Sequence, residues 1–194
     1  MIQTPCIIFA GGKSSRMGRD KSLLPFDKSP TLTHYQYQRL KKIFEKVYIS
    51  CKDPSKFDFE DDFIVDVVDT DIYAPTVGFV SIYKEIKDSS FFVLSVDSPF
   101  VSKDIIYKLF REDDENVDAT IALTPIGMQP LCGIYHRSLE KKFNDMLDGD
   151  NHKLGYLLKN SNTKFVRFEN EDEFLNLNHP DEYKKAQQII RPLV

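Results

Sequence analysis

A short glycine-rich loop near the N-terminus contains the residues best suited to chemistry in this chain of 194 residues. The loop reads Gly11-Gly12-Lys13-Ser14-Ser15-Arg16-Met17-Gly18-Arg19-Asp20-Lys21. It holds three of the chain's eight glycines, and glycine lets a backbone turn sharply and present its N–H groups to an anion. Its side chains give a local charge of +3, whereas the whole chain carries −4. This combination predicts a site for a triphosphate.

Two familiar phosphate-binding patterns do not fit the loop. Five residues separate Gly12 from Gly18, and Arg19 follows, whereas a Walker loop has four intervening residues and then Lys-Ser or Lys-Thr. The dinucleotide pattern G-x-G-x-x-G does not match either. The loop therefore predicts a different class of nucleotide-binding protein.

The residue types of the loop suggest a role for each. We expect Lys21 to bind the phosphates as a mobile point charge and Arg16 to bind them as a bidentate fork. We expect the backbone of four successive residues to surround the phosphates: Phe9, Ala10, Gly11 and Gly12. Lys21, Arg16 and these four residues are the predicted nucleotide-binding set of the loop.

One carboxylate, Asp97, directly follows an apolar run from Phe91 to Val96 that is typical of a buried strand. Ligands of parallel sheets bind beyond the carboxyl ends of the strands. Mg²⁺ is usually held by one or two carboxylates together with phosphates and water. We therefore expect Asp97 to bind Mg²⁺ and to take part in catalysis with Lys21 and Arg16.

Short apolar runs alternate with stretches of helical period along the chain. The predicted strands are residues 5–10, 46–51, 63–68, 91–96, 119–123, 131–135 and 164–168. The predicted helices cover residues 32–44, 80–86, 105–110 and 139–158, with a last helix from residue 179 onward and N-caps at Thr31 or Thr33, Thr76 and Ser102. Strands that are apolar on both faces and alternate with helices predict an α/β fold with a largely parallel sheet between helical layers.

Length and composition exclude several classes of protein. The length fits a single domain over residues 1–194, and the apolar runs are far shorter than the ~20 residues of a membrane span. The N-terminus has no pattern of a secretion signal, so we expect a cytoplasmic protein. The net charge of −4 argues against nucleic acid or a membrane as partner. The cysteines Cys6, Cys51 and Cys132 are scattered and predict reduced core residues.

The loop pattern G-G-K-x-x-R-M-G-x-D-K, with eight specified positions in eleven residues, resembles the signature of the molybdenum cofactor guanylyltransferases. Related branches that act on isoprenoid precursors or sugar 1-phosphates end this loop in Pro-Lys, whereas this chain has Asp20-Lys21. The resemblance implies a Rossmann-like three-layer nucleotidyltransferase fold with a mixed, mostly parallel central sheet.

Four further segments follow in the order of that family. An acidic stretch over residues 67–71 precedes Ala74-Pro75-Thr76-Val77-Gly78, where the family has Gly-Pro-Leu-Ala-Gly. A buried strand is followed by Asp97-Ser98-Pro99. The segments Q-P-L-x-x-x-Y and N-x-N-x-P correspond to residues 129–135 and 176–180. The similarity therefore extends from residue 5 to about residue 185.

The resemblance implies transfer of GMP from GTP to molybdopterin, with release of pyrophosphate. The attacking phosphate monoester has a second pKa near 6, so it is mostly ionised at neutral pH and needs no protein base. Asp69 is implied as the acid that contacts the nucleotide, with Asp71 as the alternative. Asn178 and Asn176 are implied on the molybdopterin or metal side, and residues 129–135 in the pterin pocket. Transient contact with molybdopterin-supplying and molybdoenzyme-maturation proteins is also implied.

Two departures from the family pattern leave the base preference open. The turn at residues 74–78 differs from Gly-Pro-Leu-Ala-Gly, and Ser50 stands where relatives often have Asn. The alternatives are therefore a molybdopterin cytidylyltransferase and a non-catalytic nucleotide-binding protein of the same fold.

Overall fold

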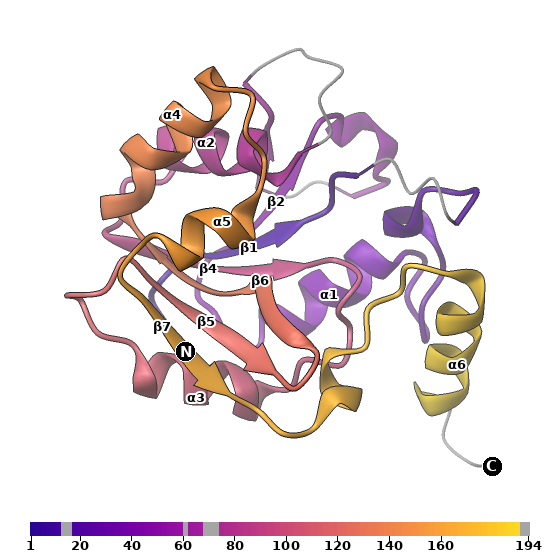
Figure 1. Ribbon diagram of the computed structural model, residues 1–194. Coiled ribbons are helices and arrows are strands. Elements are labelled where there is room, and N and C mark those ends of the chain that lie inside the picture. Colours follow the sequence, from indigo (N-terminus) through magenta and orange to yellow (C-terminus); the bar gives the residue numbers. More distant parts are fainter. Residues whose placement is uncertain (13–16, 60–61, 68–73, 191–194) are drawn as a thin grey trace.

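A seven-stranded sheet forms the centre of the protein, in the strand order β3-β2-β1-β4-β6-β5-β7 (Figure 1). The computed structural model describes residues 1–12, 17–59, 62–67 and 74–190. The strands are β1 Cys6–Phe9, β2 Val47–Cys51, β3 Phe63–Val65, β4 Ser90–Ser95, β5 Ala119–Thr124, β6 Gly127–His136 and β7 Thr163–Arg167. All seven predicted strands are present, although β3 is shorter and β6 longer than expected.

The order and directions of the strands predict a ligand site beyond the carboxyl ends of β1 and β4. β3, β2, β1 and β4 run parallel to one another, and β7 is parallel to β5. β6 is antiparallel to both β4 and β5. The expected α/β fold with a mixed, mostly parallel sheet is thus confirmed. The chain runs from β1 to β2 on one side and later returns to β4 on the other, and ligands of such sheets bind at this reversal of strand order.

Helices cover both faces of the sheet and make three layers (Figure 1). They are α1 Leu32–Leu40, α2 Pro75–Glu85, α3 Lys103–Glu112, α4 Glu140–Asp148, α5 Leu154–Lys159 and α6 Pro180–Ile190. Alternate residues of β1 enter two separate cores: Cys6 and Ile8 pack on the side of α1 and α3, and Ile7 and Phe9 on the side of α2, α4 and α5. No helix in the described part of the chain combines the length and apolar character needed to cross a membrane.

Two of the predicted helix N-caps are confirmed and one is wrong. Thr31 accepts a hydrogen bond from the N–H group of His34, and Ser102 accepts one from the N–H group of Ile105, so both are N-caps. The prediction that Thr76 caps α2 is wrong, because α2 already begins at Pro75 and has no side-chain cap. The helix expected over residues 139–158 is divided into α4 and α5, with a positive φ of 50° at residue 150 in the turn between them.

The pairing of β6 with β5 is interrupted by a bulge in the segment that contains Leu131. Ile121 of β5 pairs with Gly133, but the next residue of β5 pairs with Gln129, so residues 130–132 have no partner in β5 and form a bulge in this ladder. Pro130 lies in this bulge, where a missing N–H group is tolerated. Its carbonyl oxygen accepts a hydrogen bond of 2.7 Å from the hydroxyl of Tyr135.

Gly133→Ala is expected to destabilise the protein by about 1–3 kcal/mol. A Cβ atom at Gly133 would overlap the carbonyl oxygen of Thr120, which belongs to the neighbouring strand and cannot easily move. Urea unfolding followed by circular dichroism measures the free energy of unfolding. Gly155→Ala is the control, because the nearest atom to a Cβ there is the sulfur of Met128 at 3.6 Å. Equal stability of the two variants would show that β6 adapts to the added methyl group.

Candidate active site

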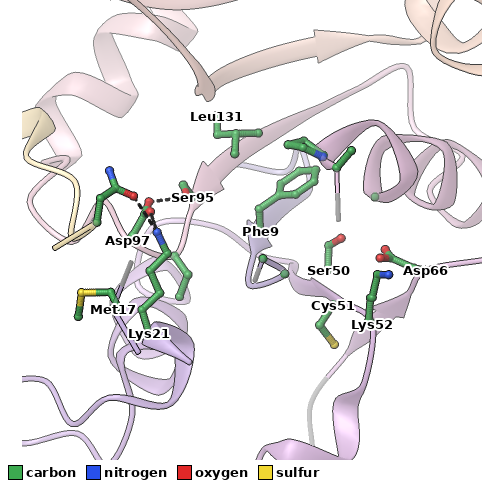
Figure 2. A pocket seen from close by; sticks show the side chains of 17 residues that line it. Phe9, Met17, Lys21, Ser50, Cys51, Lys52, Asp66, Ser95, Asp97 and Leu131 are labelled. Carbon is green, nitrogen blue, oxygen red and sulfur yellow. Dashed lines mark hydrogen bonds and ion pairs between the residues drawn. The ribbon is translucent and has the colours of Figure 1, made fainter. Parts of the chain in front are cut away.

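A cavity of about 380 Å³ opens at the carboxyl ends of the parallel strands β1, β2, β3 and β4 (Figure 2). Its volume lies within the usual range for sites of small molecules. Gly11 and Gly12 follow β1, Lys52 follows β2, Asp66 follows β3 and Asp97 follows β4, and all five line the cavity. The residues at the strand ends therefore converge as expected for this type of sheet.

One end of the cavity brings together three side chains that are distant in sequence. The ammonium group of Lys21 forms an ion pair with Oδ2 of Asp97. It also donates a hydrogen bond of 2.9 Å to Oδ1 of Asn178. Lys21 and Asn178 are 157 positions apart, so the fold alone creates this cluster. It places a mobile cation and two kinds of oxygen ligand next to one another.

Asp97 is held in place from several directions. The hydroxyl of Ser95 donates a hydrogen bond of 2.6 Å to Oδ1, and the backbone carbonyl of Asp97 accepts one of 2.9 Å from the N–H group of Leu177. Ser98 donates a hydrogen bond of 2.5 Å to the side-chain oxygen of Asn176. These bonds join the segment before α6 to the turn after β4. Asp97 is only 7% exposed, so its carboxylate has a fixed position.

The start of α6 positions Asn178. Glu182 reaches back over the first turn and accepts hydrogen bonds from the N–H groups of Asn178 and His179, at 2.6 and 2.8 Å. A glutamate in this place satisfies N–H groups that a helix start leaves without intrahelical partners. The backbone of Asn178 is thereby fixed, and its side-chain oxygen is directed at Lys21.

The opposite end of the cavity contains a second carboxylate, Asp66, beside Lys52 (Figure 2). Burial raises the pKa of the Asp66 carboxyl above its usual value, and the charge of Lys52 opposes this rise. Cys51 also lines this end, and burial raises the pKa of its thiol to about 12, so the thiol is protonated at neutral pH. The ionisable groups at this end are thus suited to recognition by hydrogen bonds rather than to nucleophilic attack.

Phe9 and Gly78 lie next to each other and both line the cavity. A Cβ atom at Gly78 would lie 2.7 Å from Cε1 of Phe9 and 3.1 Å from Oγ of Ser50. The absence of a side chain at Gly78 lets α2 approach β1 and keeps this part of the cavity open. Leu131, carried by the bulge in β6, lines the cavity above Phe9 (Figure 2).

Comparison with known proteins identifies the family. The model of the MobA-like NTP transferase domain matches residues 6–164. A molybdenum cofactor guanylyltransferase of Campylobacter jejuni subsp. doylei is 43% identical over 186 residues, which cover 96% of both chains. The chain belongs to the molybdenum cofactor guanylyltransferase family. A guanylyltransferase of Helicobacter pylori strain G27 is 31% identical over 192 residues, with 96% of this chain and 93% of the relative covered.

Solved structures share the fold of this guanylyltransferase-family chain. The molybdopterin-guanine dinucleotide biosynthesis protein A of Archaeoglobus fulgidus superposes with a TM-score of 0.82 at 20% identity, covering 96% of this chain and 98% of that one. The bifunctional IspDF of Campylobacter jejuni superposes with a TM-score of 0.71 at 18% identity, covering 94% and 54%. The expected nucleotidyltransferase fold is therefore confirmed.

The structure places most of the predicted site residues of this guanylyltransferase-family protein around the cavity. They are Phe9, Gly11, Gly12, Lys21, Asp97 and Asn178. Ala10 is not among the lining residues, and its N–H group already donates a hydrogen bond of 2.9 Å to the carbonyl of Ser50, so it is not available to a phosphate. Phe9 contributes its ring to the cavity (Figure 2).

Three of the predicted residues cannot be placed. Arg16, Asp69 and the alternative Asp71 lie outside the described residues. Of the segment 129–135, Leu131 lines the cavity. Asp66 was not predicted from the sequence, because the strand was expected to continue to residue 68, whereas β3 ends at Val65 and Asp66 is the first residue after it.

The oxygen atoms beside Lys21 fit a hard divalent cation that is bound together with a nucleotide. Within the described ranges, no group of three or more His, Cys, Asp and Glu side chains could hold a metal ion. Mg²⁺ takes oxygen ligands and commonly needs only one or two carboxylates, with phosphates and water completing its shell. The buried carboxylate of Asp97 and the nearby amide oxygen of Asn178 meet this requirement in a guanylyltransferase-family site.

Proposed function

We propose that this protein transfers GMP from GTP to the terminal phosphate of molybdopterin, forming molybdopterin guanine dinucleotide and releasing pyrophosphate. The cluster of Lys21, Asp97 and Asn178 at the end of the glycine-rich loop carries this proposal. It supplies a mobile cation and a buried carboxylate where a triphosphate and its metal require them. The names of the Campylobacter and Helicobacter relatives support the same reaction.

In this proposal, each end of the cavity binds one part of GTP. Guanine lies at the end with Asp66 and Lys52, and the triphosphate extends toward Gly11, Gly12 and Lys21. Arg16, which follows in the same loop, assists Lys21 at the phosphates. Leu131 lies on the molybdopterin side. The chain needs no general base, because the attacking phosphate is already ionised at neutral pH.

Asp97 is the proposed ligand of Mg²⁺, and Asn178 lies beside it. A divalent cation held there would neutralise charge on the phosphate oxygens during the transfer. Lys21 balances the carboxylate of Asp97 when no nucleotide is present. In the complex with GTP, Lys21 would pair with the phosphates and Asp97 would hold the cation. Lys21 would thus bind the negative phosphates, and Asp97 would bind the positive cation, of the same substrate complex.

Asp66 is proposed to select the base. Guanine presents N1–H and N2–H donors next to the O6 acceptor. The carboxylate of Asp66 matches the two donors, and the ammonium group of Lys52 matches O6. This assigns to Asp66 the role that the sequence pattern gives to Asp69. A competition experiment with GTP and CTP at equal concentration tests the proposed preference, which requires GTP to be the nucleotide incorporated.

Asp66→Asn is expected to weaken GTP binding by at least about tenfold and to improve binding of XTP. Xanthine carries a carbonyl oxygen where guanine has its N2 amino group, and the amide of asparagine donates a hydrogen bond where a carboxylate only accepts. Isothermal titration with both nucleotides measures the two affinities. Asp62→Asn is the control, because it removes the same charge from an exposed residue near β3. An unchanged ratio of GTP to XTP affinity would remove Asp66 from the base site.

The test of the non-catalytic alternative is product formation. A protein that only binds nucleotide would show GTP affinity but no pyrophosphate when molybdopterin is added.

Proteins that supply molybdopterin or receive the product are proposed as transient partners, since both substrate and product must pass to and from other proteins.

A further inference from the structure

Lys56 makes contacts that the proposed chemistry does not use. It ends the short turn η2 Pro54–Lys56, which lies between β2 and β3. Its ammonium group is 2.8 Å from Oδ2 of Asp20 and 3.1 Å from Oγ of Ser22. A longer contact of 3.4 Å reaches the carbonyl oxygen of Ala10. About one fifth of the side chain is exposed, so these contacts are partly shielded from water.

The three acceptors belong to the two stems of the glycine-rich loop. Ala10 directly precedes Gly11 and Gly12, and Asp20 and Ser22 stand on either side of Lys21. One ammonium group from a separate part of the chain therefore links the beginning and the end of the loop. A lysine has three N–H donors, and the three acceptors occupy them. Lys56 is thus placed to fix the loop rather than to bind a phosphate itself.

The partners of Lys56 are themselves rigid. Asp20 caps the turn η1 Lys21–Leu23 by accepting hydrogen bonds from the N–H and Oγ groups of Ser22, at 3.0 and 2.6 Å. The carbonyl of Ser22 accepts a hydrogen bond of 2.8 Å from Thr33 of α1. Burial raises the pKa of Asp20, but hydrogen bonds from Lys56 and Ser22 outweigh it and hold the pKa below its usual value. Asp20 is therefore ionised at neutral pH.

The turn that carries Lys56 is also fixed. Asp53 caps η2 by accepting a hydrogen bond of 2.9 Å from the N–H group of Ser55, and Pro54 occupies the first position of the turn. Proline at this position has its φ angle already set for a helical turn. Lys56 thus connects a rigid turn after β2 with the rigid turn that carries Lys21.

We propose that Lys56 is a positioning residue of the nucleotide site, which holds both stems of the glycine-rich loop through Ala10, Asp20 and Ser22 and so sets the position of Lys21. This inference rests on the proposed function, because it concerns the triphosphate end of the same cavity. It also assigns a purpose to Asp20, which stands next to Lys21 in the loop pattern but does not line the cavity.

The test compares GTP with GMP, both measured by isothermal titration in the presence of Mg²⁺. Lys56→Met is expected to weaken GTP binding by about tenfold or more and to leave GMP binding within about twofold. GTP depends on the triphosphate end, and the side chain of Lys56 donates its hydrogen bonds to Ala10, Asp20 and Ser22 in the stems of the loop at that end. Lys56→Arg is expected to restore most of the affinity, because arginine keeps the charge and several donors.

Two further variants separate positioning from general stability. Lys142→Met is the matched control: Lys142 also contacts a carboxylate and a hydroxyl, Asp118 at 3.2 Å and Ser161 at 3.1 Å, at the other edge of the sheet. It should leave both affinities unchanged. Asp20→Asn keeps a residue that caps turns well but removes the charge, so it should reproduce the GTP loss even if Lys56→Met does not fold.

The outcomes distinguish this inference from the proposed function. Unchanged GTP binding in Lys56→Met and Asp20→Asn, or an equal loss for GTP and GMP, would overturn the positioning role while the wild type still binds GTP. A wild-type protein that binds no GTP would overturn the proposed function and the inference together. A selective loss for GTP, with rescue by arginine, supports the positioning role.

Discussion

Exchanging Asp97 for asparagine is expected to lower kcat/KM for GMP transfer by about 10²–10³-fold. The substitution keeps the shape of the side chain, and the remaining oxygen can still accept the hydrogen bond from Ser95. It removes the negative charge that the proposed metal requires, at a position only 7% exposed where water cannot replace it easily. The loss should appear mainly in kcat, because the cation acts on charge that develops in the transition state.

The metal itself provides a second measurement for Asp97. Mn²⁺ binding followed by electron paramagnetic resonance in the presence of GTP should be strong in the wild type and weak in Asp97→Asn. Asp104→Asn, on α3, removes one carboxylate without touching the cavity and serves as control. Metal-dependent turnover and Mn²⁺ affinity equal to those of the wild type would exclude Asp97 as the metal ligand.

Lys21→Ala is expected to lower kcat/KM by at least about tenfold, because the variant loses a charge-assisted contact to the phosphates. The same substitution should have the opposite effect on metal binding without nucleotide. In the ligand-free protein Lys21 pairs with Asp97 and competes with any cation for that carboxylate. Removing Lys21 should therefore increase Mn²⁺ affinity in the absence of GTP.

Opposite changes in activity and in metal affinity make the Lys21 prediction specific. A general disturbance of the fold would lower both quantities. Lys28→Ala, which removes an exposed lysine close in sequence, should change neither. An unchanged kcat/KM for Lys21→Ala would remove Lys21 from the site, and a lower Mn²⁺ affinity would contradict its competition with the cation.

The sequence predicted those parts of the site that leave a local signal. Glycines and basic residues gathered in one loop indicate a phosphate site, and Asp97 was found because it follows a long apolar run. Asn178 needed the family pattern, since an asparagine before a helix is common as a cap. Asp66 was missed because Val67 and Val68 continue the apolar run of β3, so the strand was expected to end later than Val65.

Contacts between residues far apart in the chain could not be predicted from the sequence. Lys56 lies 34–46 positions from its three partners in the stems of the glycine-rich loop, and a single lysine in a polar stretch gives no sign of them. The wrong N-cap at Thr76 has a local cause instead: Pro75 already occupies the first position of α2, so the helix begins two residues too early for Thr76 to cap it. The fold was predicted well because apolar strands and amphipathic helices alternate regularly.

Release of pyrophosphate from GTP tests the central claim most directly. The purified protein is incubated with molybdopterin, Mg²⁺ and either GTP or CTP, and pyrophosphate is followed with time. The proposed function predicts release that requires molybdopterin, that is much faster with GTP than with CTP, and that is lost in Asp97→Asn. Equal or faster release with CTP would contradict the guanine preference, and no release with either nucleotide would contradict the transferase reaction itself.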